Sequence, residues 1–369
     1  MPLTKVRNQG LSFTSGVRNL IINGAMQISQ RGTSFSYAHD GTIAAYNLDR
    51  FNFAMRGGGY ADEYDCTVAQ VSDSPNGFSN SLKITTGTAE SAIAADEYYV
   101  LYQSIEGQNL QQLGYGTSSA ESITLSFYVK SSLTGTFGTT LYQADDNRVI
   151  NKTYTISSAN TWERKTITFP ADTTGVIDND NGGGLNVYWT FGAGSDFDGG
   201  SATTWTAYTT TNLVDSSGSD ALITTAGATW QVTGVQLEVG DSASNFEHRS
   251  FADELRRCQR YYIRKKADSA YTFFGAGFNA TTSSSRIHIN FPVEMRAAPS
   301  IGQSANSTFA MYSGVNSPGF SADATVNNPS THGTALTTTH PSSSLTVGYG
   351  ALLMANNDTS AFLEFVAEL

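Results

Sequence analysis

The chain has 369 residues, more than one ordinary core holds, because domains usually contain about 100 to 200 residues. Its 32 acidic and 21 basic residues leave a net charge of −11, which repels phosphate backbones and argues against a nucleic-acid partner. No run of about 18 apolar residues is present, so no membrane insertion is predicted. Charged residues make up only 14% of the chain, and its many Ser, Thr, Asn and Gly residues suit antiparallel sheets with frequent turns.

The N-terminal 18 residues carry three basic residues and no sustained hydrophobic period. On composition alone this segment is a frayed terminus. Strand patterns begin after it, with apolar and β-branched residues alternating with polar ones between Gly-, Asn-, Asp- and Ser-rich turns. The expected strands are 20–28, 46–55, 65–71, 81–86, 98–105, 123–130, 136–143, 152–156, 162–169, 185–191, 203–208 and 230–239. Short strands at this spacing predict a sandwich or a barrel, and a double-sheet jelly roll over residues 19–249 fits best.

Aromatic residues near the polar loops are candidates for gripping a sugar, since a ring face stacks on the C–H face of a sugar while neighbouring amides bond its hydroxyls. Burial in the core is the alternative for each ring. The candidates are Tyr98, Tyr99, Tyr102, Trp189, Phe197, Trp205 and Tyr208.

The acidic loop 178–184, with sequence DNDNGGG, invites a metal interpretation. Asp178 and Asp180 place carboxylates at alternate positions, and the glycines allow a tight turn, as in loops that wrap calcium. The loop lacks the closing Glu of an EF-hand. Ordinary turn chemistry is therefore the alternative to a calcium site.

Residues 228–264 join a strand pattern, a polar bend and a helix pattern. An extra residue at Thr233 and Gly234 predicts a β-bulge, and Ser250 followed by Asp253 has the spacing of a capping box, so a helix should begin at Phe251. A connecting helix is expected over 250–266. The basic face of this helix is either solvated or forms ion pairs with a neighbouring domain or subunit; it includes Arg256, Arg257 and Arg260.

The string TGVQLEVGDSASNFEHRSFADELRRCQRYY, residues 233–262, resembles the signature of a family of bacteriophage tail-fibre and related virion proteins. The resemblance extends to NLIINGAMQISQRG at 19–32, YNLDRFNF at 46–53 and the strand pair within 122–170. The family is built around a jelly-roll domain similar to carbohydrate-binding modules. Within the signature, Glu247, His248 and Arg249 are expected to form a polar corner between strand and helix.

The resemblance implies a virion protein that assembles as a homotrimer and binds host surface polysaccharide. It also implies that the peptide 1–18 docks onto other tail or capsid proteins, as an alternative to a frayed terminus. A capsid-decorating or head-fibre protein needs nearly the same parts. The family motifs concern strands and a helix, and none is catalytic.

Residues 267–369 again show alternating segments separated by polar turns, and a smaller C-terminal β-sandwich is predicted, whose tip loops are a natural contact surface. Cys66 and Cys258 are too few for a disulfide framework and are expected to be small buried residues. No nucleophile elbow, zinc-binding His pair or phosphate loop is present, so no enzymatic activity is predicted. A carboxylate pair that degrades polysaccharide stays open as an alternative.

Overall fold

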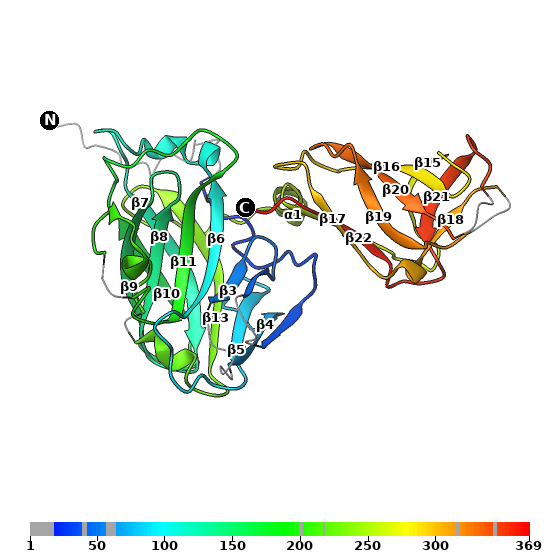
Figure 1. Ribbon diagram of the computed structural model, residues 1–369. Helices are drawn as coiled ribbons and strands as arrows, with labels where there is room; N and C mark the ends of the chain where they lie inside the picture. Colours follow the sequence, from blue (N-terminus) through cyan, green and yellow to red (C-terminus); the bar gives the residue numbers. More distant parts are fainter. Residues whose placement is uncertain are drawn as a thin grey trace. The chain divides into compact units, whose positions relative to one another are not determined.

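The computed structural model describes residues 18–38, 43–56, 64–198, 202–216, 218–314, 318–341 and 345–369. Apart from Arg18, the proposed N-terminal anchor lies outside these residues. The chain divides into two compact units, Met1–Phe251 with Leu369 and Ala252–Glu368 (Figure 1). Nowhere in the described ranges does a helix have the length and apolar character needed to cross a membrane.

The first unit contains two antiparallel sheets. The six-stranded sheet has, in spatial order, β1 (Ser34–Ala38), β4 (Asp65–Val71), β5 (Ser81–Thr86), β13 (Thr229–Val239), β7 (Ile123–Ser131) and β10 (Glu163–Phe169). The seven-stranded sheet has β12 (Thr206–Ala207), β9 (Arg148–Ile156), β8 (Gly135–Gln143), β11 (Gly183–Ala193), β6 (Tyr98–Glu106), β3 (Asn52–Arg56) and β2 (Ile43–Tyr46). Short 3-10 helices lie at Gly107–Asn109, Gln111–Leu113, Thr210–Asn212 and Ser219–Leu222.

One hydrophobic core joins inward-facing residues of both sheets of this unit. In β7 the alternate residues Ile123, Leu125, Phe127 and Val129 are all fully buried, as the period of two requires. The predicted bulge is confirmed, because the register of β13 against β7 shifts between Thr233 and Gln236. The all-β sandwich class predicted from the sequence is therefore correct.

The second unit is also a β-protein. Its three-stranded sheet has β14 (Tyr262–Lys266), β22 (Phe362–Val366) and β17 (Ser300–Gln303), and its six-stranded sheet has β18 (Phe309–Tyr312), β21 (Gly350–Ala355), β15 (Phe273–Asn279), β16 (Ser284–Asn290), β20 (Gly333–Thr339) and β19 (Ala322–Asn327). A 3-10 helix spans Asn306–Thr308. Residues from both sheets share one core, which contains Ile263, Phe365 and Leu353. Helix α1 (Phe251–Gln259) begins at the predicted residue.

The structure differs from the sequence-based expectation in several places, among them the expected strand 203–208, of which only Thr206–Ala207 (β12) is a strand. Residues 20–28 form turns rather than a strand, because Asn23 has a φ of 62° and its side chain bonds both backbone groups of Ile28, at 2.8 and 2.9 Å. The expected strand 46–55 is a hairpin that turns at Arg50, with a φ of 72°. The helix stops at Gln259 instead of reaching 266, because the backbone of β14 pairs with β22.

Cys66 and Cys258 are both free and buried, as predicted.

Candidate functional site

The outward face of the seven-stranded sheet in the first unit carries a row of aligned side chains. Tyr188 of β11 lies opposite Tyr102 of β6, Tyr102 lies opposite Asn52 of β3, and Asn52 lies opposite Tyr46 of β2. The neighbours of the first two tyrosines, Leu101 and Trp189, are fully buried in the core between the sheets. Because successive side chains of a strand point to opposite faces, Tyr102 and Tyr188 must point away from that core.

Aromatic rings gather in pairs on this outward face. The Tyr102 and Tyr188 ring centroids are 5.1 Å apart, and those of Tyr142 and Tyr208 are 5.2 Å apart. Tyr98 packs edge-on against Phe197, with centroids 4.9 Å apart. We call this set the tyrosine face; its members are Tyr98, Tyr102, Tyr142, Tyr188, Tyr208 and Phe197.

Residues between β11 and β13 form one border of the tyrosine face. Phe197 and Val214 pack with Ala54 and Val100 in a small cluster separate from the main core. Three partly buried tyrosines pack against this cluster, namely Tyr98, Tyr102 and Tyr188. At the β9 end of the row, Thr140 bonds Asn151 at 2.8 Å, and Asn151 bonds the carbonyl of Asn212 at 3.1 Å. Beyond this border the row continues from Tyr188 to Tyr46, whose hydroxyl donates to the carbonyl of Leu369 at 2.6 Å and whose ring centroid lies 5.3 Å from the Arg31 guanidinium.

The hydroxyls of Tyr98, Tyr142 and Tyr188 stay neutral at physiological pH. Burial raises the pKa of Tyr188 well above its ordinary value, and the nearby Tyr102 hydroxyl adds to the effect. Burial also raises the pKa of Tyr98 and of Tyr142. Asn186 donates to the Tyr188 hydroxyl at 3.3 Å. Neutral phenols both donate and accept hydrogen bonds, which suits an uncharged ligand rich in hydroxyls.

Asn52 lies buried within the row. It is 3% exposed, and its Oδ1 has no hydrogen-bond partner in the described structure. A buried polar atom left unpaired costs about 1–3 kcal/mol, so this oxygen is a destabilising feature of the row. The outward parity of Asn52 follows from its neighbour Phe53, which lies in the core.

The structure brings together four of the seven aromatic candidates, namely Tyr98, Tyr102, Phe197 and Tyr208. Tyr99 and Trp189 are fully buried in the core, so they present no ring face to a ligand. Trp205 lies elsewhere, with its Nε1 donating to the carbonyl of Pro170 at 2.7 Å and its ring against Tyr115.

Sequence reasoning missed Tyr142 and Tyr188, although a signal for both was present. Tyr188 stands between Val187 and Trp189, and Tyr142 follows Leu141; these three neighbours are core residues. Strand parity alone places the two tyrosines on the outward face.

The polar corner of the family signature fastens the start of the domain to its last strand. Glu247 accepts a bond from the backbone N–H of Asn19 at 2.7 Å, and Arg249 donates to the carbonyls of Asn19 and Ile21. Glu247 and Arg249 also pair at 3.2 Å. His248 packs against Phe78, with ring centroids 5.2 Å apart. These contacts give the corner a structural role.

The acidic loop candidates for calcium, Asp178 and Asp180, lie beside Asp145. Asp145 Oδ2 accepts from the Asp178 N–H at 2.9 Å, while Asp180 Oδ1 accepts from the N–H of Gly182 at 2.8 Å. Burial raises the pKa of Asp145, with smaller contributions from the charges of Asp178 and Asp180. No group of three or more acidic, His or Cys side chains in the described ranges is placed to hold a metal ion. The Asp180 contact is ordinary turn chemistry.

No protein-family model matches the chain, and no curated protein matches it. Among solved structures, the enzymatically active domain of tailspike protein 4 from bacteriophage CBA120 matches 60% of this chain and 21% of its own chain, at 12% identity and a TM-score of 0.30. A family 11 carbohydrate-binding module of Clostridium thermocellum matches over 63% of this chain and over the module's own whole length, at 11% identity and a TM-score of 0.28. A putative sugar-binding protein of Bacteroides thetaiotaomicron matches over 60% of this chain and over its own whole length, at 12% identity and a TM-score of 0.31. Similarities this low assign no function, which must come from the geometry of this chain.

Proposed function

We propose that this protein binds a neutral glycan on the tyrosine face of its first unit. The observation that carries the proposal is the aligned row from Tyr188 across Tyr102 and Asn52 to Tyr46. It crosses four strands, a span of about 15 Å at ~4.8 Å per strand, which suits an extended oligosaccharide more than a single sugar. Tyrosine rings offer apolar faces for sugar C–H groups, and their hydroxyls bond sugar hydroxyls.

Charge favours an uncharged glycan at this face. From the sequence, the first unit holds 24 acidic and 13 basic residues, so the whole net charge of −11 lies in it. The second unit holds eight of each and is neutral. A strongly acidic unit repels an anionic polysaccharide at long range, whereas it exerts no such repulsion on a neutral polysaccharide.

The setting proposed for this activity is a bacteriophage virion, where the protein serves as a tail fibre that attaches to the host cell surface. The resemblance of residues 233–262 to the tail-fibre signature supports this proposal. A homotrimer anchored to other virion proteins through residues 1–18 completes it. A capsid-decorating or head-fibre role is the alternative, because it requires the same scaffold and the same kind of contact surface.

The protein is proposed to bind its glycan without cleaving it. The tyrosine face is built from rings, hydroxyls and amides, and among the described residues the Arg56 guanidinium lies 5.3 Å from the Phe197 ring centroid. Glycoside hydrolysis ordinarily uses two carboxyl groups flanking the scissile bond. Reducing ends released from a bound polysaccharide would overturn this part of the proposal and favour a polysaccharide-degrading fibre.

The proposal is tested by retention of the full chain on an array of neutral and acidic bacterial surface polysaccharides. The double variant Tyr102→Ala/Tyr188→Ala should lose at least tenfold in affinity for whichever neutral glycan the wild type retains. Tyr271→Ala is the matched control, since that tyrosine is 56% exposed in the second unit. Unchanged retention of the double variant would contradict the proposal, and loss on replacing the loops of the second unit would move the contact there.

A further inference from the structure

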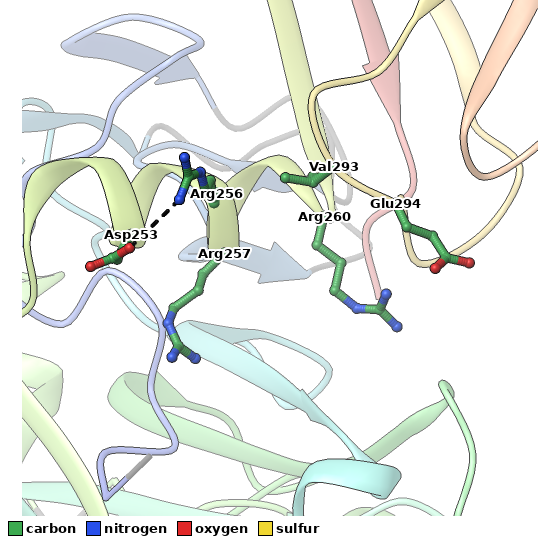
Figure 2. A pocket seen from close by; sticks show the side chains of 6 residues that line it. All are labelled: Asp253, Arg256, Arg257, Arg260, Val293 and Glu294. Atoms are coloured by element: carbon green, nitrogen blue, oxygen red, sulfur yellow. Dashed lines mark ion pairs between the residues drawn. The ribbon is translucent and has the colours of Figure 1, made fainter. Parts of the chain in front are cut away.

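The second unit holds a hollow of about 370 Å³ beside helix α1, lined by Asp253, Arg256, Arg257, Arg260, Val293 and Glu294. We call it the arginine groove. Figure 2 shows that four of its side chains come from the helix and the segment just after it, and that Val293 and Glu294 come from a turn farther along the chain. The backbone N–H of Arg296 donates to the carbonyl of Arg260 at 2.7 Å, which ties this turn to the end of the helix.

Helix geometry explains why three arginines share this groove. Glu254 and Cys258 are buried, so the opposite side of α1 faces outward. Arg256 and Arg257 belong to α1, and Arg260 follows its last residue, so the end of the helix brings all three to the same hollow. Like charges this close repel one another, so an anion in the groove would relieve the repulsion.

The acidic residues of the groove offset these charges only in part. Arg256 Nη1 and Asp253 Oδ1 are 3.9 Å apart, with side chains 70% and 62% exposed, and such exposed pairs contribute little (Figure 2). Glu294 Oε1 is engaged elsewhere, accepting from Thr331 at 3.2 Å and lying 3.8 Å from His332. Within the described ranges, Arg257 has no ion pair. Among the residues that line the groove, three guanidinium groups stand against two carboxylates.

A guanidinium donates two parallel hydrogen bonds to a carboxylate or a phosphate, so these are the groups that the arginine groove suits. Val293 gives its wall an apolar patch, against which a sugar ring can pack. The unit around it is neutral, unlike the first unit, and therefore does not repel an anionic ligand.

We propose that the arginine groove is a second saccharide site, which binds the carboxylate or phosphate of an acidic sugar. This site is independent of the tyrosine face and differs from it in ligand class. Because the two sites lie in different units and use different chemistry, either proposal can fail while the other holds.

The test is calorimetric titration of the full chain with three probes: galacturonic acid oligomers, inorganic phosphate and a neutral oligosaccharide of matched length. The wild type should bind at least one anionic probe, more weakly as salt rises, and Arg256→Gln/Arg257→Gln should weaken that binding at least tenfold. Comparison of the first two probes shows whether carboxylate or phosphate is preferred. Unchanged thermal unfolding of the variant verifies its fold, since Gln is nearly as good a helix former as Arg.

The matched control is Lys266→Gln/Arg286→Gln, which removes two positive charges from the same unit outside the groove. Equal weakening by both double variants would overturn the site, because it would indicate net charge alone. If neither the galacturonic acid oligomers nor inorganic phosphate bind at millimolar concentration, the proposed site is also overturned. A molar mass in solution that falls on substitution of Arg256 and Arg257 would assign the groove to a second copy of the chain instead.

Discussion

Asp198 and Asp220 lie in environments that disfavour their charge. Burial is the largest cause that raises the pKa of each carboxyl, and bonds from Ser216 lower it in part. A carboxyl whose pKa is raised on folding stabilises the protein below the ordinary Asp pKa, and this stability is lost as pH rises through the raised value.

Replacement of either carboxylate by an amide should therefore stabilise the first unit at neutral pH. We expect Asp198→Asn and Asp220→Asn each to add about 0.5 kcal/mol at pH 7.5 after solvent screening, and nothing at pH 3. Thermal unfolding at the two pH values measures this, with Asp196→Asn at an exposed position as the control. Equal shifts at both pH values would contradict the assignment.

Gly234, at the bulge of β13, is required both by its backbone and by its surroundings. Its φ is +61°, and an added Cβ would come within 2.6 Å of the Phe78 ring and 3.0 Å of Tyr128. We expect Gly234→Ala to lower the free energy of unfolding by roughly 3 kcal/mol, from left-handed strain together with overpacking. Gly227→Ala isolates the first term, because Gly227 has a φ of +74° with nothing within 4 Å. If urea unfolding shows equal losses of stability for Gly234→Ala and Gly227→Ala, overpacking against Phe78 and Tyr128 contributes nothing.

At the residue scale, strand parity was sufficient to place part of the site. Tyr98 and Tyr102 share an outward face because Tyr99 and Leu101 are inward, and the same argument applies to Tyr142 and Tyr188. It could not place Phe197, which reaches the face from an irregular segment whose path depends on tertiary packing. The orphaned Oδ1 of Asn52 likewise has no sequence signal.

At the element scale, Asn19 joins the start of the domain to β13. Its amide donates to the carbonyl of Val235 at 3.0 Å, and its Oδ1 accepts from the N–H groups of Ile21 and Leu237, both at 3.0 Å. The residue is 2% exposed, so its removal leaves three backbone groups unpaired and buried.

Asn19→Ala should therefore cost about 3 kcal/mol in the free energy of unfolding, roughly 1 kcal/mol for each orphaned group. Chemical denaturation followed by tryptophan fluorescence measures it. Asn109→Ala, at an exposed position, should change stability by less than about 0.5 kcal/mol. If Asn19→Ala lowers the free energy of unfolding no more than Asn109→Ala does, Asn19 does not hold the start of the domain against β13.

Most elements with a clear period could be predicted, and those fixed by side-chain bonding could not. Strands β4 and β5 have the predicted bounds, and α1 begins where its cap spacing places it. Residues 20–28 have a strand-like composition, yet the bonds of Asn23 close them into a turn. The end of α1 depends on pairing with β22, about 100 residues later, which local periodicity does not record.

At the scale of the whole molecule, the charge of the chain is divided between its units, with −11 in the first and none in the second. This division supports two ligand classes in one protein, a neutral glycan on the tyrosine face and an acidic sugar in the arginine groove. Salt should therefore weaken binding at the second site and leave the first nearly unchanged.

The proposed homotrimer predicts a molar mass in solution of three times the 39.4 kDa of one chain. Light scattering coupled to size exclusion measures it directly. A mass that stays at one chain over micromolar concentrations would contradict the trimer and leave each chain to bind glycan alone.

The most direct test of glycan binding is hydroxyl-radical footprinting of the full chain, with and without a saturating neutral oligosaccharide selected from the array. Oxidation of Tyr102 and Tyr188 should slow when the ligand is bound, because the sugar covers their rings. Tyr271 and Tyr349, which are 56% and 59% exposed in the second unit, should react at unchanged rates. Protection of these two tyrosines without protection of the tyrosine face would contradict the account.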